Sequence, residues 1–260
     1  MSTAPAPPVS SFPLAVRSRA GTIAAPAEPS IVEPAGPAAA PGAAIARDSS
    51  WLTTNEGTAP ATMLVADLRG FTGISRRLGA AATAAFLNRL FGAIVPCIEA
   101  EAGRIDKFIG DAVLAVFGLA PAAGAEADRA LRAAIAIQRA IAELNRAALH
   151  PAGTSLAIAI GIDAGEVFFG RIGAATCAAP TVIGASVNAA FALQKACKRY
   201  QAGILISAAV RRHLAGRYCL RRLDAPCVHE PSLDEAGETE PVYEVLDHHS
   251  EATLPGRRRR

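Results

Sequence analysis

The stretch that decides the fold is RIDKFIGDAVLAVFG, residues 104–118. Two apolar runs flank the dipeptide Gly110-Asp111, and Gly-Asp favours the two-residue turns whose twist matches that of the adjoining strands. The sequence therefore predicts a hairpin. Lys107 and Asp111 are charged residues within this otherwise apolar hairpin, so an account of the function has to explain both.

Outside the hairpin, apolar spacing predicts further strands and helices. Strands are expected at residues 61–68, 155–173, 203–207 and 241–245, and the second of these is expected to be a pair of strands broken at residues 163–165. Helices are expected at residues 71–103, about 124–149 and about 186–200, with Pro96 bending the first or starting a second helical piece. This order predicts an α+β sandwich with helices packed on one face of a mainly antiparallel sheet.

Length and composition predict one compact domain with two tails. The chain has 260 residues, which is enough to bury a core of ordinary size. Residues 1–58 are dominated by Pro and Ala and predict a disordered N-terminal arm. Residues 59–247 hold the patterned domain, and residues 248–260 form a basic tail that is expected to be disordered. The net charge of +3 is scattered over amphipathic helices, so no nucleic-acid partner is expected.

Three features of the sequence bear on cellular location. The N-terminus lacks a charged segment before its short apolar piece, so no secretory signal is expected. No stretch approaches the roughly 20 uninterrupted apolar residues that a bilayer span needs, so no membrane span is expected. The five cysteines lack metal-ligand spacing, which indicates free thiols in a reducing compartment. We therefore expect a cytoplasmic protein.

Two aspartates lie where predicted strands meet turns. Asp67 closes the first strand, and Asp111 completes the turn of the hairpin. Each alone is more typical of a cap or turn, but carboxylates at the ends of neighbouring strands can face each other and bind a hard divalent cation. Glycines after Asp67 let backbone N–H groups approach a phosphate just before a helix begins. The candidate anion-binding residues are Gly70, Phe71, Thr72 and Gly73.

Four motifs follow one another along the chain: VADLRGFTGIS, GRIDKFIGDAVLAVFG, IGIDAGEVFFGRIG and TVIGASVNAA. In this order and spacing they resemble the catalytic domain of class III nucleotidyl cyclases, the adenylate and guanylate cyclases, over about residues 61–247. The resemblance implies an α+β, ferredoxin-like nucleotidyl cyclase fold. It also implies an enzyme that converts ATP to 3′,5′-cyclic AMP and pyrophosphate. It also implies a homodimer, or a heterodimer with another cyclase chain, with ATP and two Mg²⁺ or Mn²⁺ ions in clefts between the subunits.

The resemblance assigns roles to the two aspartates and their neighbours. Asp67, Asp111 and the backbone carbonyl of Leu68 match the metal ligands of the family, and Asn188 matches the asparagine that orients the ribose. Two ions held in this way could lower the pKa of the ribose 3′-hydroxyl and neutralise charge on the leaving pyrophosphate.

Lys107 and Thr181 match the pair that distinguishes the purines in the family. A lysine donor can meet adenine N1, and a hydroxyl can accept from the N6 amino group, which favours ATP over GTP. Threonine in place of the commoner aspartate is a variant among bacterial members. Without the resemblance, Lys107 would be a strand lysine whose ammonium stays in solvent. The resemblance implies that the hairpin serves two clefts, with Asp111 facing the metals of its own subunit and Lys107 reaching the adenine bound with the partner.

The sequence departs from the family pattern at three places. Ala192 occupies the position, four residues after Asn188, where the family normally has an arginine that stabilises the transition state. Losing such a donor costs on the order of 3 kcal/mol, or about 100-fold in rate, and Lys195 would be a poor substitute. The C-terminal segment has no lysine for the terminal phosphates, although Arg221 or Arg222 could replace it, and proline precedes Thr181 where an aromatic residue is frequent.

Two hypotheses follow from the pattern and its departures. The first is an adenylate cyclase that works by two-metal catalysis at a homodimer interface, slowly because of Ala192. The second is a catalytically impaired, cyclase-like module that binds nucleotide, or pairs with another cyclase chain to regulate it. A guanylate cyclase conflicts with Lys107, because guanine selection usually calls for an acidic acceptor at that position.

Overall fold

The computed structural model describes residues 56–119, 125–147, 155–174, 176–223 and 240–246. Nearly all of the expected N-terminal arm and the whole basic tail lie outside the described residues. The strands are β1 (Gly57–Leu68), β2 (Arg104–Ile109), β3 (Ala112–Phe117), β4 (Ile158–Ala174), β5 (Cys177–Ile183), β6 (Ile204–Ile206), β7 (Leu220–Leu223) and β8 (Val242–Val245). The helices are α2 (Phe71–Leu78), α3 (Ala80–Ala100), α4 (Glu126–Arg146), α5 (Ala185–Tyr200) and α6 (Ala208–His213).

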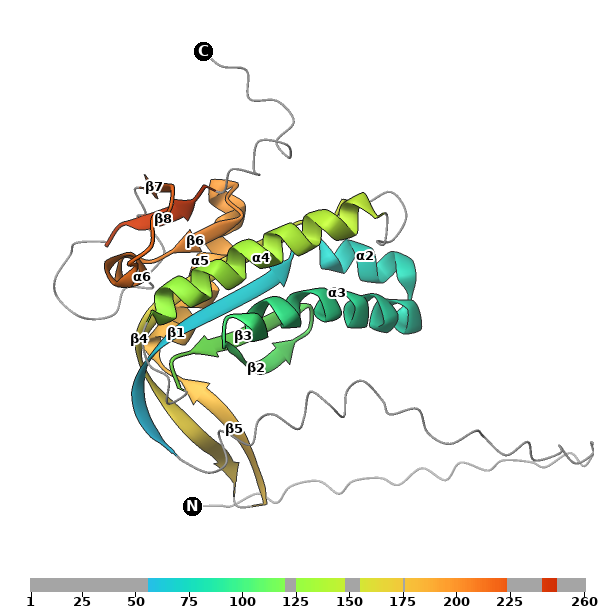
Figure 1. Cartoon of the computed structure of the whole chain (residues 1–260). Coiled ribbons are helices and arrows are strands. Elements are labelled where there is room, and N and C mark those ends of the chain that lie inside the picture. The colour runs from blue at the N-terminus through green and yellow to red at the C-terminus, as the bar shows by residue number, and fades with distance from the viewer. Residues whose placement is uncertain (1–55, 120–124, 148–154, 175, 224–239, 247–260) are drawn as a thin grey trace, which may run out of the picture. The chain divides into compact units, whose positions relative to one another are not determined.

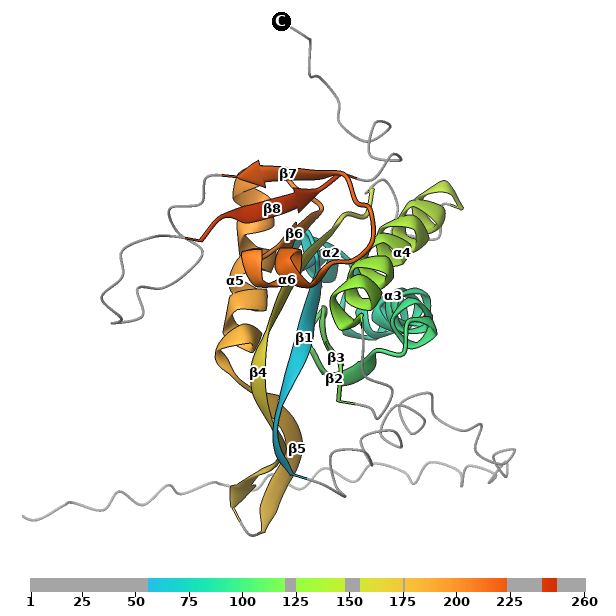
Figure 2. The same ribbon diagram turned by 60° about the vertical axis from the view of Figure 1, so that its left-hand side comes forward.

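The strands form one mixed sheet (Figure 1). Its order is β2-β3-β1-β4-β6-β8-β7, and β5 pairs with β4 off this path. All neighbouring strands are antiparallel except β4 and β6, which are parallel. The predicted α+β class and mainly antiparallel sheet are therefore confirmed. The β4–β5 pair extends beyond the other strands as a two-stranded ribbon (Figure 2).

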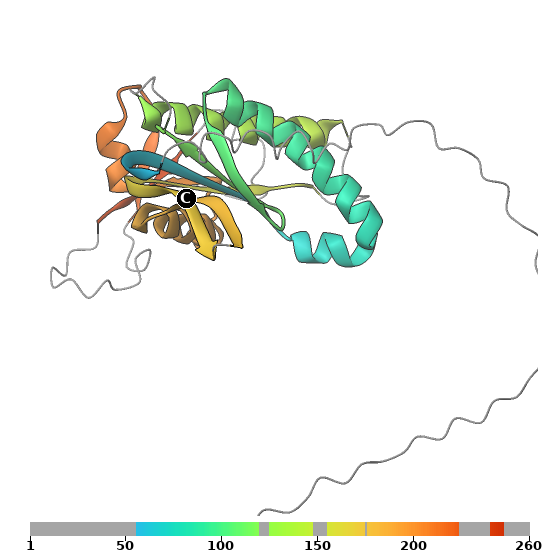
Figure 3. The same ribbon diagram turned by 90° about the horizontal axis from the view of Figure 1, so that it is seen from below.

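Helices cover both faces of the sheet, whereas the sequence predicted helices on one face. In β1, Leu64 and Ala66 belong to the core that includes side chains of α3 and α4. Met63 and Val65 belong to a second cluster, which includes Ala190 of α5. Figure 3 shows α4 and α5 on opposite sides of the sheet. Because side chains alternate along a strand, both faces of β1 must be apolar, which explains its uninterrupted hydrophobic run.

Strand β4 corrects the predicted strand pair, because it runs unbroken through residues 163–165. These residues pair in register with β1, so long-range pairing overrides the turn preference of Asp-Ala-Gly. The same ladder extends β1 at its other end. Gly57 pairs with Phe169, and β1 therefore begins before residue 59, where the domain was expected to start.

The first predicted helix is divided at Gly79 and not at Pro96. Gly79 has a φ of 73°, which glycine adopts without a steric penalty, and it separates α2 from α3. Pro96 lies inside α3. The predicted helices at about 124–149 and 186–200 are confirmed as α4 and α5, whereas β5, β7 and α6 were not anticipated.

One described helix, α3, is long and apolar enough to cross a bilayer, which the sequence prediction did not anticipate. It has 21 residues. Its buried residues are Phe86, Leu90, Ile94 and Ile98, which recur every fourth position and pack in the core with α4. A helix packed in a protein core can meet the same criteria of length and composition, so this feature is weak evidence for a membrane span.

The approach of α5 to the sheet requires a glycine in β4. A Cβ atom at Gly161 would overlap the carbonyl oxygen of Ala190 and the backbone nitrogen of Gln194. Backbone atoms of a helix cannot move aside as a flexible side chain can, so α5 lies directly on the strand only because position 161 has no side chain.

A buried carboxylate ties α4 to the segment between α6 and β7. Asp128, 3% exposed, accepts hydrogen bonds of 2.9 Å from the N–H groups of Ala215 and Gly216 and from the hydroxyl of Tyr218. Burial raises the pKa of Asp128, but these hydrogen bonds outweigh burial and hold its pKa below the ordinary value. Burial and the bond to Asp128 raise the pKa of Tyr218 to about 12.

Candidate active site

The structure brings the two predicted metal-binding aspartates together. Asp67 pairs with Ala112 in the β1–β3 ladder, and Asp111 directly precedes Ala112 at the hairpin turn. Gly110 has a φ of 63°, the left-handed conformation that such a turn requires and glycine tolerates. Burial and the negative charge of Asp67 raise the pKa of Asp111 to about 6. The two carboxyl groups therefore repel each other across a short separation.

This pair of carboxylates suits a hard divalent cation. A cation between Asp67 and Asp111 would offset their repulsion, and carboxylate oxygens are the ligands that Mg²⁺ and Mn²⁺ favour. Within the described ranges no three His, Cys, Asp or Glu side chains gather into a metal-binding group. Further ligands would have to come from backbone carbonyls, water or substrate, and the carbonyl of Leu68 stays a predicted ligand.

A glutamine that the sequence prediction missed holds Asp67. The Nε2 amide of Gln194 donates to Oδ2 of Asp67 over 3.0 Å, and Gln194 is 8% exposed. The spacing of Ala190, Leu193, Gln194 and Cys197 places this polar residue on the buried face of α5. A polar residue on an apolar helix face needs a partner, and that requirement was the signal in the sequence.

Arg69 supplies a second link between the end of β1 and α5. Its guanidinium donates to the backbone carbonyl of Cys197 over 3.1 Å and to that of Ala202. These carbonyls lie at and just beyond the last turn of α5, where a cation is favourable. The residues that follow Asp67 are thereby fixed against the same helix that holds its carboxylate.

The predicted anion-binding segment begins two residues after Leu68. Gly70 is left-handed, with φ 76°, and precedes α2, whose N-terminus has no side-chain cap. Phe71 packs against the core, whereas Thr72 and Gly73 are exposed. The N–H of Gly73 is bonded to the carbonyl of Gly70, so the earlier N–H groups of the helix are the ones that can meet an anion.

Lys107 and Thr181 meet although 74 residues separate them in the sequence. The ammonium of Lys107, on β2, donates to the hydroxyl oxygen of Thr181, on β5. Thr181 reaches this place because β5 folds back on β4 and pairs it with Gly170. The side chain of Lys107 is still 41% exposed, so its ammonium meets solvent as well as Thr181.

Helix α5 begins just after the strand that carries Thr181. Asn188 lies in the first half of α5 and is exposed, and Lys195, two helical turns later, is exposed as well. Ala192 is half-buried and packs against a cluster that includes Leu193 and Cys197. The position of the missing arginine is thus filled by a small apolar contact. Arg221, one of the two arginines predicted as a substitute phosphate ligand, is ion-paired with Glu244 on β8.

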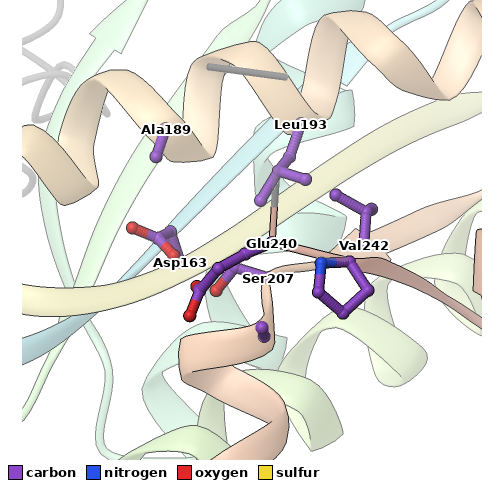
Figure 4. Close-up of a pocket in the computed structure, with 8 residues that line it drawn as sticks. Asp163, Ala189, Leu193, Ser207, Glu240 and Val242 are labelled. Carbon is purple, nitrogen blue, oxygen red and sulfur yellow. The ribbon is translucent and has the colours of Figure 1, made fainter. Parts of the chain in front are cut away.

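A small cavity lies beneath α5, between α6 and the start of β8. Polar side chains of Asp163, Ser207 and Glu240 reach it, with Ala189 and Leu193 above them (Figure 4). Its volume is about 20 Å³, which has room for about one water molecule. This cavity cannot hold a nucleotide, and it is separate from both Asp67 and Lys107.

The chain matches the sequence model of the adenylate and guanylate cyclase catalytic domain over residues 54–230. The chain belongs to this family. It is 33% identical to an adenylate cyclase of Anabaena cylindrica over 190 residues, covering 71% of the chain and 36% of that protein. It is 29% identical to the terminal-differentiation specific adenylate cyclase of Dictyostelium discoideum, covering 72% of the chain and 8% of that protein. The chain thus spans only a minor part of these relatives.

Solved cyclase structures have the same fold. The adenylyl cyclase CyaB from P. aeruginosa matches with a TM-score of 0.64 at 28% identity, covering 74% of this chain and 96% of that chain. A crystal structure of a guanylyl cyclase matches with a TM-score of 0.59 at 30% identity, covering 73% and 93%. The predicted nucleotidyl cyclase fold is therefore confirmed. Since an adenylyl and a guanylyl cyclase match about equally well, overall similarity does not show whether the chain prefers ATP or GTP.

Proposed function

We propose that this domain is an adenylate cyclase, converting ATP to 3′,5′-cyclic AMP and pyrophosphate at the interface of a homodimer. One observation carries the proposal: each chain presents two partial sites, the Asp67–Asp111 pair and the Lys107–Thr181 pair. Domains of this family act on nucleotides as dimers. A second copy would bring the base-reading pair of one chain to the carboxylate pair of the other.

The contact between Lys107 and Thr181 supports the choice of ATP. An ammonium has three donors, so Lys107 can donate to adenine N1 while it keeps its bond to Thr181. The hydroxyl of Thr181 retains a lone pair that can accept from the adenine N6 amino group. Guanine offers an N1–H donor and an O6 acceptor at these positions, so the same pair would face it with mismatched polarity.

The remaining residues position the substrate. Asp67, Asp111 and the carbonyl of Leu68 would hold two divalent cations, which when bound favour ionisation of the ribose 3′-hydroxyl and neutralise the triphosphate. Gln194 keeps the Asp67 carboxylate in place. Backbone N–H groups at the start of α2 would contact phosphate oxygens, and Asn188 would orient the ribose.

Exposed apolar side chains support a homodimer. Among the described residues the large exposed hydrophobics are Ile109, Ile172 and Ile183, at 47%, 42% and 50%. Ile109 adjoins the hairpin turn, and the other two lie on the β4–β5 ribbon that projects from the sheet (Figure 2). These are the elements that carry Lys107, Asp111 and Thr181, so an interface that buries the isoleucines would also assemble the site.

The test is complementation between two inactive chains. Purified protein with Mn²⁺ and ATP should form cyclic AMP, and Asp67→Asn and Asn188→Ala should each lose most of that activity. In this proposal Asn188, on the helix that follows the strand of Thr181, belongs with the base-reading pair and comes from the partner of the chain that supplies Asp67. An equal mixture should then recover about a quarter of wild-type activity, because half of the dimers are mixed and each has one intact site. Activity in the mixture no greater than the sum of the separate variants would refute the shared site.

Ala192 favours a second candidate, a regulatory module that binds nucleotide or pairs with another cyclase chain. The half-buried methyl group at this position offers no hydrogen bond to a transition state. This alternative predicts nucleotide binding with turnover at background, and activity that appears only when another cyclase chain is added. Cyclic AMP formed by the purified homodimer, and lost in Asp67→Asn, would exclude it.

A further inference from the structure

Strand β2 contains a bulge at Asp106. In the β2–β3 ladder Ile105 pairs with Ala115 and Lys107 pairs with Leu114, so that Asp106 has no partner of its own. An extra residue of this kind re-aims the side chains that follow it. Lys107 therefore pairs with Leu114, which belongs to the cluster on the α5 face of the sheet. From this position the Lys107 ammonium reaches Thr181 on β5.

The carboxylate of Asp106 lies buried beside this ammonium. Its side chain is 0% exposed, and Oδ2 is 3.3 Å from Nζ of Lys107, whose side chain is 41% exposed. Neither carboxylate oxygen has a hydrogen-bond partner of good geometry among the described residues. Burial raises the pKa of Asp106 above its ordinary value, and Lys107 and the backbone N–H of Val182, the residue after Thr181, offset only part of that rise.

The buried Asp106 carboxylate restricts the position of the Lys107 ammonium. A carboxylate removed from water is strongly disfavoured unless a cation compensates it, and Lys107 is the cation given by the structure. An ammonium on a flexible four-carbon stem would otherwise sample many positions. The buried charge draws it toward β5, where it donates to Thr181. The Asp106 side chain is fully buried, so it is not exposed to a base and acts through the ammonium.

We propose that Asp106 is a specificity-determining positioning residue, which holds the Lys107 ammonium against Thr181 so that the donor for adenine N1 is in place before ATP binds. The inference rests on the proposed function, because it names what sets the base preference of that site. A preset donor removes an ordering cost from ATP binding, so Asp106 acts on KM for ATP more than on kcat. It acts only through Lys107.

A double-mutant cycle tests this dependence. Asp106→Asn keeps the shape and removes the charge, and it should lower the ratio of kcat/KM for ATP to that for GTP by about tenfold, mainly through KM. Lys107→Gln should lower the ratio as well, since an amide can face either base with a donor or an acceptor. In the Lys107→Gln background, Asp106→Asn should change the ratio no further. Equal effects in both backgrounds would overturn the proposal.

Two further variants separate positioning from stability. Glu244, on β8, is another buried carboxylate paired with a cation, Arg221 of β7. Glu244→Gln should leave the ATP-to-GTP ratio unchanged even where it lowers the melting temperature. Asp106→Glu keeps the charge and should retain part of the preference, so a loss as large as in Asp106→Asn would count against the proposal. If Asp106→Asn melts below the assay temperature, Asp106→Ser supplies the same comparison.

Binding measurements distinguish failure of this inference from failure of the proposed function. If the wild-type protein makes no cyclic AMP, equilibrium binding of fluorescent ATP and GTP analogues replaces the kinetic ratio, and Asp106→Asn must still lower the preference for the ATP analogue. If the wild-type protein makes cyclic AMP and Asp106→Asn leaves the preference intact, the proposed function stands and Asp106 has only a structural role.

Discussion

Replacing Ala192 by arginine should raise the rate of cyclisation. Ala192 lies on α5 four residues after Asn188, about 6 Å further along the helix axis and on the same face. An arginine at this position would present its guanidinium beside the group that orients the ribose. Ala192 is half-buried at the edge of a cluster, so a long side chain can cover that cluster with its stem and still reach solvent with its head.

The size of the effect follows from what one donor contributes to a transition state. A single preorganised donor is worth about 2.7–4 kcal/mol, or about 100- to 1,000-fold in kcat. Part of that gain is lost if the core contact of the methyl group is disturbed, at a cost of about 1 kcal/mol. We therefore expect Ala192→Arg to raise kcat by about 20- to 150-fold, with a smaller change in KM, since the donor acts mainly in the transition state.

Single-turnover formation of cyclic AMP at saturating Mn²⁺ measures this step without product release. The matched control is Ala196→Arg, which places the same side chain one turn further along α5, where Ala196 packs against the same cluster. It should leave kcat unchanged. Lys195→Ala in the wild-type protein shows whether the exposed lysine already supplies a charge. No gain in a folded Ala192→Arg protein, or an equal gain in Ala196→Arg, would refute the reasoning.

Three other changes test contacts described above. Gln194→Leu removes the hydrogen bond to Asp67 and should raise the Mn²⁺ concentration for half-maximal activity by about 10- to 100-fold; an unchanged metal titration in a folded variant contradicts this. Asp128→Asn should destabilise the protein by about 2 kcal/mol at neutral pH in denaturant unfolding. Because the pKa of Asp128 is lowered on folding, this stabilisation is present above about pH 4 and fades as the pH falls through the folded-state pKa, so the difference between wild type and variant should shrink on acidification. Gly161→Ala would push a Cβ into Ala190 and should lower the melting temperature by several degrees, for about 1–3 kcal/mol of overpacking; a wild-type melt would show that α5 can move away from β4.

The parts of the site that the sequence predicted are those fixed by local rules. Gly110-Asp111 gave the hairpin because only a few dipeptides suit a two-residue turn. The convergence of Asp67 and Asp111 followed because each adjoins a predicted strand, and an aspartate at the end of β1 must lie near the start of β3 once these strands pair. The first turn of α2 was foreseen from its glycines. The hairpin and the first turn of α2 needed no distant element, whereas the convergence of the two aspartates needed the pairing of β1 with β3.

The features that the sequence did not predict depend on contacts between distant segments. Residues 163–165 have the composition of a turn, but pairing with β1 keeps them extended. Strand β5 is short of large apolar side chains and contains Pro180, so it is stabilised by its long partner β4 and not by its own propensity. The bond from Gln194 to Asp67 joins residues 127 positions apart, and no local pattern fixes such a distance.

The bulge at Asp106 shows how one residue decides whether the hairpin can carry its lysine. In a regular strand Ile105 and Lys107 would share a face, and Phe108 would point the other way. Ile105 and Phe108 both pack in the core with α3 and α4, which two residues three apart in a strand can do only if an extra residue lies between them. If Asp106 paired as a regular strand residue and formed no bulge, Phe108 and Lys107 would exchange faces, and the ammonium would enter that core with no partner. The apolar spacing of 105 and 108 and the charge at 106 are therefore two aspects of one arrangement, because the bulged residue also supplies the countercharge for the lysine that the bulge turns toward β5.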